Sequence, residues 1–326
     1  MGNNKLPNYF GYFQENTNFA DMIRRLGTWC AVMLMALLVC ACGDSDEKRR
    51  QRTKAEQERQ QAAWQAALKI AVTPTMDCLP FYLLKDSMLY DTAAVDIRLV
   101  TYNAHLDSDT AFVRRHVEGM TTDLVRVEHL RRTGHPVAYA TATDAHWQLY
   151  ANKHARIKEL SQLSDRLIAM TRYSATDLLT DRALKKGKTK YPGYKVQIND
   201  VKVRLQMLLN NEMDALWLME PQATVARRTG ANVLMDTRKD SLTLGVLAFR
   251  VDVMADDRRY QQIETLLKAY DAAVDRINSN GIKTYAPLIH KYMAVDEQVI
   301  DALPAMRYNR SSQPLPKDIA VAASHP

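Results

Sequence analysis

Polar side chains cluster where two buried strands are predicted to end. The segment LKIAV (68–72) predicts the first strand, and the loop after it carries Thr75 and Asp77, with Phe81 offering an aromatic face. Thr122 and Asp123 follow a second strand-like segment. Open α/β sheets bind ligands at the carboxyl ends of their strands, so we expect these five residues to contact a ligand. The alternative is a simple strand-to-helix turn, with Phe81 in the core and Asp123 capping a helix.

A second group of polar residues lies further along the chain. Arg172, Tyr173 and Ser174 stand where another strand ends and a helix opens, and Glu220 follows the strand ALWLM (215–219). Free N–H groups at a helix start, with an arginine and a hydroxyl, suit a carboxylate, sulfonate or phosphate. Ser174 acting only as a helix cap is the alternative. Arg172 favours an acidic ligand group, whereas Asp77 and Glu220 favour a cationic one, so the pattern leaves a zwitterion or a neutral heterocycle open.

No set of residues in the sequence is typical of a catalytic centre. Cys78 has no obvious base beside it, and the eight histidines show neither HExxH nor another metal-ligand spacing. Walker and GxGxxG loops are missing as well. We therefore predict a protein that is not an enzyme and that carries no metal and no cofactor.

The order of the segments predicts an α/β fold. Short apolar strands alternate with helices, as expected for two mostly parallel sheets flanked by helices. One predicted helix, VKVRLQMLLN (201–210), has Val201, Leu205 and Leu208 on one face. The last third, including a long amphipathic helix over 256–278, should pack back over the first lobe. Strands are predicted at 68–72, 96–103, 137–143, 147–152, 166–171, 196–199, 215–219, 232–235 and 244–250, and further helices at 110–118, 174–186, 221–229 and 285–293.

The segment MIRRLGTWCAVMLMALLVCACG (22–43) has the order of a secretory signal. Two arginines precede an apolar run, and small residues precede Cys42, as in the lipobox of bacterial lipoproteins. We expect Met22 to be the true start, residues 1–41 to be a signal peptide, and Cys42 to carry lipid, palmitate included. A short membrane anchor or a core helix is the alternative. The protein should then sit in the cell envelope, anchored to a membrane and facing the periplasm or the cell exterior.

The remaining composition is that of a globular protein. Hydrophobic residues make up 47% of the chain, charged residues 25%, and the formal net charge is +7. A nucleic-acid surface would need a basic face with base-reading groups, so we expect no nucleic-acid partner. Residues 42–67 are read as the lipid-bearing cysteine and a charged linker.

Several of these motifs together resemble a known family. KIAVTPTMDCLPFYLL, DRLIAMTRYSATDLL and NNEMDALWLMEPQATVARRTGANVL are similar to the substrate-binding proteins of ABC transporters with the type II periplasmic fold, nearest the branch of nitrate, sulfonate and thiamine-pyrimidine binders. Asn211 stands where that family often has glycine. The resemblance implies two lobes that close on a small molecule, lobe 1 at 68–144 plus 245–326 and lobe 2 at 145–244. It also implies an ABC permease as partner, and we expect a monomer.

Two other functions stay open at this point. One is an enzyme on the same fold, similar to the chorismate dehydratases, which work in the cytoplasm and would lack a lipobox. The other is a surface lipoprotein that kept the fold without transport. The acidic start of the linker, Asp44 to Glu47, is similar to export tags of some surface lipoproteins.

Overall fold

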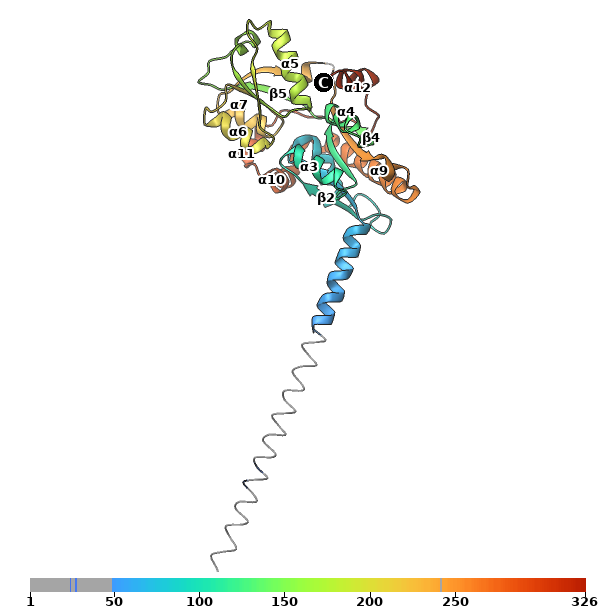
Figure 1. Cartoon of the computed structure of the whole chain (residues 1–326). Coiled ribbons are helices and arrows are strands. Elements are labelled where there is room, and N and C mark those ends of the chain that lie inside the picture. Colours follow the sequence, from blue (N-terminus) through green and yellow to red (C-terminus); the bar gives the residue numbers. More distant parts are fainter. Residues whose placement is uncertain (1–23, 25–26, 28–48, 241) are drawn as a thin grey trace, which may run out of the picture. The chain divides into compact units, whose positions relative to one another are not determined.

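The computed structural model describes Arg24, Gly27 and residues 49–240 and 242–326 (Figure 1). Residues 49–66 form one exposed helix, and the chain divides into a unit of residues 1–66 and a compact unit of residues 67–326. Apart from Arg24 and Gly27, the expected signal segment lies outside the described residues, as does Cys42. No helix in the described part of the chain is long and apolar enough to cross a membrane.

Two five-stranded sheets form the compact unit, and each belongs to one lobe. The strand orders are β2-β1-β3-β10-β4 in the first sheet and β7-β6-β8-β5-β9 in the second. The strands of the first sheet are β1 (Leu68–Val72), β2 (Ile97–Thr101), β3 (Gly119–Asp123), β4 (Val137–Ala142) and β10 (Gly245–Arg250). Those of the second sheet are β5 (Gln148–Ala151), β6 (Leu167–Met170), β7 (Tyr194–Gln197), β8 (Ala215–Leu218) and β9 (Asn232–Asp236).

The strand directions confirm mostly parallel sheets. In the first sheet β10 pairs antiparallel with β3 and β4, while the other strands share one direction. In the second sheet β5 is the reversed strand, between β8 and β9. Each reversed strand is the first strand in the sequence after the chain crosses between the sheets: β5 follows β4 of the first sheet, and β10 follows β9 of the second. Each therefore starts at the junction of the lobes and runs away from it.

Helices cover the faces of both sheets, as Figure 1 shows. The α-helices are α2 (Leu79–Asp86), α3 (His105–Val113), α4 (Leu124–Arg132), α5 (Ala175–Gly187), α6 (Val201–Leu209), α7 (Gln222–Arg228), α8 (Val251–Met254), α9 (Asp257–Asn280), α10 (Ala286–Met293), α11 (Glu297–Asp301) and α12 (Pro316–Ala323). Short 3-10 turns are η1 (Met76–Cys78), η2 (Leu160–Leu163), η3 (Thr237–Lys239) and η4 (Ile282–Tyr285). The predicted helix over 110–118 lies earlier than expected, because α3 ends at Val113 and Gly119 already opens β3.

Apolar residues form three buried clusters. One packs α2 and α9 against the first sheet, with Tyr270 on α9 fully buried, and another packs α6 and α7 against the second sheet. The third contains residues of both sheets, from Met120 on β3 to Trp217 on β8. The apolar surface of this third cluster is buried from water only while the lobes are in contact. Its burial therefore favours the closed arrangement seen here.

The C-terminal segment also joins the lobes. Helix α12 packs along α4, and the chain ends near α5 (Figure 1). His325 accepts a hydrogen bond at its carbonyl from Arg132 of α4 (2.7 Å), and its Nε2 lies 3.5 Å from Asp177 of α5. The last residues of the chain therefore contact one helix from each lobe.

Candidate functional site

The carboxyl ends of strands from both lobes face each other across a small cavity. Thr73 and Thr75 follow β1, Asp123 ends β3, Thr171 follows β6 and Met219 follows β8. The cavity has a volume of about 20 Å³, room for a water-sized group only. Its other lining residues are Asn103, His105, Trp147, Ser174, Thr176, Val201, Arg204 and Trp217.

Hydrogen bonds across this junction keep the lobes together. The Met76 N–H donates to the carbonyl of Glu220 (2.8 Å), and the side-chain amide of Gln222 donates to the carbonyl of Pro74 (3.2 Å). On another side of the cavity, the Val201 N–H donates to the carbonyl of Asn103 (3.3 Å). Entry of anything larger than water into the small cavity therefore requires the lobes to separate.

Four helices begin at this cavity, and three of them have a side-chain cap; α3, which begins at His105, has none. Asp123 accepts from the Arg126 N–H (3.0 Å), Ser174 from the Thr176 N–H (3.1 Å) and Asp200 from the Lys202 N–H (2.7 Å). These caps fix the first turns of α4, α5 and α6 against the junction. The positive ends of the three helix dipoles therefore lie near the cavity, where they favour negative charge.

Arg204 is the most unusual group in the lining. Its side chain is 5% exposed, and neither Nε nor Nη1 has a hydrogen-bond partner. Within the described residues it forms no ion pair. Burial lowers the pKa of Arg204 to about 10, and nearby Arg126 lowers it further while Asp200 opposes the shift. The guanidinium still carries its charge at neutral pH, so the junction holds a buried cation without a counterion.

His105 lies in the same wall and adds a neutral acceptor or donor. Burial lowers its pKa to about 3, with Arg126 and Arg204 contributing, so the ring is uncharged at neutral pH. Its Nδ1 has no partner. His105 and Arg204 thus both have unpaired polar atoms at a site where water is largely excluded. Burying such atoms without a hydrogen-bond partner costs free energy, which a bound ligand would recover.

Arg126 contrasts with Arg204 because it has a partner. It is 3% exposed and donates to Asp109, whose pKa is nevertheless raised because burial outweighs the arginine. Burial likewise raises the pKa of Asp123 to about 6, against the pull of Arg126. Arg126 is thus neutralised by Asp109, and the charge of Arg204 stays available for a ligand.

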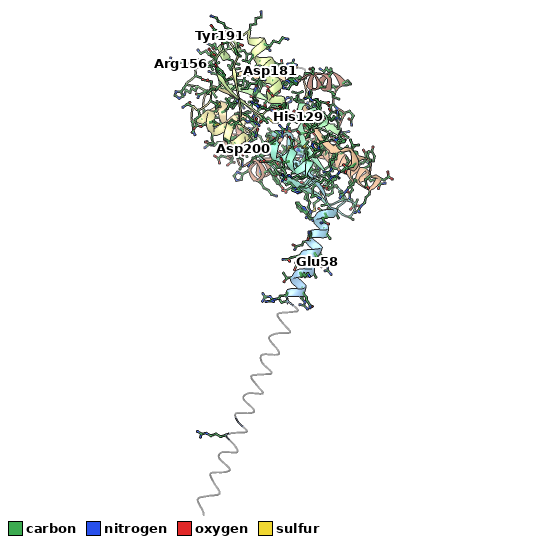
Figure 2. The ribbon with its side chains drawn as sticks, viewed as in Figure 1. Glu58, His129, Arg156, Asp181, Tyr191 and Asp200 are labelled. Carbon is green, nitrogen blue, oxygen red and sulfur yellow. The ribbon has the colours of Figure 1, made fainter. Side chains whose placement is uncertain are left out.

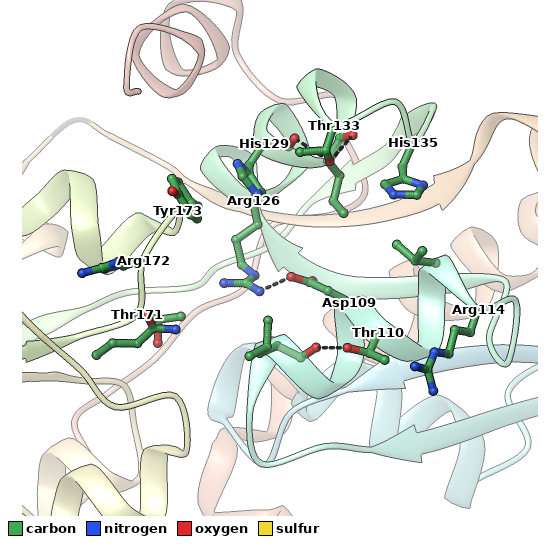
Figure 3. A pocket seen from close by; sticks show the side chains of 14 residues that line it. Asp109, Thr110, Arg114, Arg126, His129, Thr133, His135, Thr171, Arg172 and Tyr173 are labelled. Atoms are coloured by element: carbon green, nitrogen blue, oxygen red, sulfur yellow. Dashed lines mark hydrogen bonds and ion pairs between the residues drawn. The ribbon is translucent and has the colours of Figure 1, made fainter.

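A larger chamber of about 450 Å³ adjoins the small cavity (Figure 3). The two share Thr171, and Arg126 lies in the chamber wall. His129 of α4 stacks on Tyr173 of lobe 2, with ring centroids 4.1 Å apart and planes 7° from parallel. The remaining lining comes from both lobes and comprises Leu106, Asp109, Thr110, Val113, Arg114, Leu130, Thr133, His135, Arg172 and Gln197.

Five of the residues expected from the sequence to bind a ligand lie in these two spaces. Thr75, Asp123 and Ser174 line the small cavity, and Arg172 and Tyr173 line the chamber. The hydroxyls of Thr75 and Ser174 are engaged, since Thr75 bonds Thr73 (2.7 Å) and Ser174 donates to the Thr171 carbonyl (2.6 Å). The structure thus brings residues from both lobes to one junction.

The other four expected residues lie outside both linings. Phe81 is fully buried in the core against Tyr270, with ring centroids 4.9 Å apart. Glu220 faces Arg227 at 3.3 Å and accepts from the hydroxyl of a neighbouring threonine (2.6 Å). Asp77 and Thr122 are buried, and Asp77 Oδ1 and Thr122 Oγ1 each lack a partner. Burial raises the pKa of Asp77 to about 6.

Arg204 and His105 were not among the ligand contacts predicted from the sequence. The signal for Arg204 was present in VKVRLQMLLN, because Val201, Arg204, Leu205 and Leu208 follow helical spacing and are all buried. An arginine within an apolar helix face must find a partner or pay a large desolvation cost, which marks it as a candidate. His105 had no such signal, since it opens α3 after an extended linker.

One group of side chains has the composition of a metal site. Ligand atoms of Asp177, Asp181 and His325 lie within 4.8 Å of one another. Lys195 is already paired with both carboxylates, at 2.7 Å from Asp177. Because the lysine neutralises the acids, we assign no metal to this group.

Comparison with known proteins agrees with the geometry. No family model matches the chain, and no curated protein matches it significantly. The periplasmic aliphatic sulphonate binding protein SsuA from Escherichia coli superposes with a TM-score of 0.62 at 16% identity, covering 79% of this chain and 84% of that one. The zinc-bound ligand-binding component of an ABC-type import system from Staphylococcus aureus gives 0.64 at 16% identity, covering 75% and 86%.

A third similar structure is the periplasmic nitrate-binding protein NrtA from Synechocystis PCC 6803. It gives a TM-score of 0.63 at 12% identity, covering 73% of this chain and 69% of that one. These likenesses show the fold. The chain has the two-lobed fold of periplasmic binding proteins, as the resemblance in the sequence implied.

Proposed function

We propose that this protein is an extracytoplasmic solute-binding protein. It is anchored to a membrane by lipid on Cys42 and delivers a small organic solute to an ABC importer. One observation carries the proposal: the junction of the lobes encloses the buried guanidinium of Arg204, which has no partner in the described chain. A hinged clamp with an unneutralised charge inside is built to close on a ligand of opposite charge.

The solute carries an anionic group that pairs with Arg204. Neutral His105 supplies a further polar contact, and the starts of three helices add positive potential. Two of the similar structures are named for oxyanions, an aliphatic sulphonate and nitrate, which supports this choice. We keep Thr75, Asp123 and Ser174 as inner contacts, and Arg172 and Tyr173 as contacts near the chamber.

The four remaining expected residues keep a place in the proposal as supports of the site. Asp77 and Thr122 have unpaired oxygens that a ligand or an ordered water satisfies in the open state. Phe81 and Glu220 hold the walls behind the lining. We assign lobe 1 to 68–144 plus 245–326 and lobe 2 to 145–244, and we propose that the protein acts as a monomer.

An enzyme on the same fold is less well supported. Burial raises the pKa of the Cys78 thiol to about 12, with the Asp77 charge adding to the shift. The thiolate is therefore scarcely populated at neutral pH, and Cys78 is a poor nucleophile. The similar structures named above are binding proteins.

Native mass spectrometry and thermal shift on residues 67–326 test the proposal. The panel contains sulfonates, carboxylates, phosphate esters, amino acids and pyrimidines, each with a neutral analogue. We expect an anionic solute to raise the Tm in a dose-dependent way without being consumed, and Arg204→Met to remove the shift. The matched control is Arg258→Met on the exposed side of α9, which should leave the shift unchanged.

Three results would count against parts of this account. Turnover of a panel compound would favour the enzyme, and a panel without any binding solute would favour a surface lipoprotein without transport. The anchor has its own test, because Cys42→Ser should abolish incorporation of radiolabelled palmitate in cells. Labelling that persists in Cys42→Ser would remove the lipid anchor from the proposal and leave the cleft untouched.

A further inference from the structure

A group of exposed cations lies at the far end of lobe 2 from the cleft. Helix α5 follows its cap residue Ser174, which lies in the cavity wall, and runs outward to Gly187. The loop after it returns to Tyr194, the first residue of β7. Figure 2 shows Tyr191, in this loop, on the outer side of lobe 2, and His129 where the lobes meet. The lysine patch comprises Arg182, Lys185, Lys186, Lys188, Lys190, Tyr191, Tyr194 and Leu167.

The charge of the lysine patch is one-sided. Between Asp181 and Asp200 the chain contains no acidic residue, and all five cations of the patch are exposed. None of the five makes an ion pair within the described residues; Lys195, which lies on the same stretch, is paired with Asp177 and Asp181. Asp165 borders the patch, since its N–H donates to the Pro192 carbonyl (3.3 Å). Within the described residues, the positive charge of these five side chains is therefore not neutralised by an ion pair.

Aromatic and apolar side chains are exposed among these cations. Tyr191 is 50% exposed, Tyr194 57% and Leu167 40%. Lys190 Nζ lies 5.1 Å from the centre of the Tyr191 ring. Exposed rings with a polar tip, set among flexible cations, are typical of side chains at the headgroup level of a membrane.

The loop that carries the patch is firmly seated. The Tyr191 N–H donates to Ser164 Oγ (2.8 Å), and the Tyr194 N–H donates to the Arg166 carbonyl (2.8 Å). A Cβ on Gly193 would lie 2.9 Å from Ile168, and one on Gly187 would lie 2.6 Å from the Leu160 backbone. The backbone is therefore packed closely against lobe 2, and the lysines and tyrosines are presented on a fixed platform.

We propose that the lysine patch docks lobe 2 on an anionic phospholipid surface. Lysines act as point charges toward headgroup phosphates, and Tyr191, Tyr194 and Leu167 enter the interface between headgroups and acyl chains. Because the patch is at the outer end of α5, docking leaves the cleft at its inner end accessible. The inference does not depend on the ligand of Arg204 or on lipid at Cys42.

Vesicle flotation with residues 67–326 tests this proposal, since this compact unit lacks Cys42. We expect binding to vesicles of equal parts phosphatidylglycerol and phosphatidylcholine, and none to pure phosphatidylcholine. Binding should weaken steeply between about 50 and 300 mM salt, because the attraction is screened. Each lysine near such a surface is worth about five-fold in partitioning, so K185Q/K186Q/K188Q/K190Q should lower it at least about 100-fold.

Two further variants separate specific docking from general attraction. The control R258Q/K268Q/R276Q/R307Q removes four exposed cations elsewhere and should bind nearly as the unmodified body does. Y191S/Y194S keeps the charge and should weaken binding several-fold. The thermal unfolding of each variant shows whether it is folded.

The proposal is overturned if the unmodified body does not float with anionic vesicles, or if the control loses as much binding as the patch variant. It is also overturned if Y191S/Y194S binds normally while polyglutamate displaces the body from vesicles at equal charge. That last result would assign the patch to an acidic protein partner. Solute binding is unaffected in every one of these cases, so failure here is distinct from failure of the proposed function.

Discussion

Replacing Arg204 by methionine should stabilise the ligand-free protein while removing solute binding. Methionine fills similar length without a charge. A pKa lowered from 12.5 to about 10 corresponds to about 3 kcal/mol by which burial destabilises the charged folded state. Because the folded pKa lies below the unfolded one, this cost is fully present at any pH below about 10 and disappears only above about 12.5.

The expected rise in Tm at pH 7 follows from this magnitude. For a unit of this size, each kcal/mol shifts the Tm by about 2–4 °C, so the variant should melt about 6–12 °C higher. Solute affinity should fall by about 30-fold to 1,000-fold, as expected when one partner of a buried charge pair is lost. Differential scanning calorimetry without solute, and titration with it, measure the two effects separately.

Arg126→Met is the matched control, because Arg126 is as buried as Arg204 but paired with Asp109. Its removal leaves an uncompensated buried carboxylate, and we expect a loss of about 3–5 kcal/mol in the free energy of unfolding. We therefore expect the two substitutions to change the free energy of unfolding in opposite directions, although both arginines are buried. If Arg204→Met lowers the Tm as Arg126→Met does, then Arg204 has a structural partner and is not held in reserve for a ligand.

Three further predictions concern other parts of the clamp. Burial raises the pKa of Asp77 to about 6, so its charged form destabilises the fold above that pH. Asp77→Asn should therefore raise the free energy of unfolding at pH 8 by up to about 3 kcal/mol, seen as a higher Tm, and leave it nearly unchanged near pH 4. An equal gain in Tm at both pH values would refute this. In Gly245→Ala, the new Cβ would lie 2.4 Å from Thr143 Oγ1, and we expect about 1–3 kcal/mol of destabilisation in urea unfolding, with no change contradicting the close approach. Tyr173→Ala removes the stack on His129, and solute should dissociate about 2-fold to 10-fold faster in stopped flow; an unchanged rate would show that the stack plays no part in closure.

Much of the fold could be predicted from the order of apolar segments. The strand at 68–72 and the long helix near 256–278 stand out because burial on both faces and helical periodicity leave clear patterns. The start of α3 could not be read in the same way. His105–Val113 is a weakly amphipathic helix whose buried residues are Ser108, Ala111 and Phe112, so tertiary contacts and not local pattern decide where it begins.

Only part of the site could be predicted from the sequence, and the reason is physical. Sequence indicates where strands end, and Thr75, Asp123 and Ser174 were found by that rule. It does not indicate which side chains near a strand end pack into the core, as Phe81 of α2 does, or pair within one lobe, as Glu220 does. Arg204 comes from the first turns of a helix, and its isolation from any counterion depends on how two distant lobes close.

A crystal structure of residues 67–326 with the solute identified by screening tests the central claim most directly. We expect oxygen atoms of an anionic group within about 3 Å of the Arg204 guanidinium, between the two lobes, with His105 beside them. A solute bound elsewhere, with Arg204 still lacking a partner in the closed protein, would contradict it.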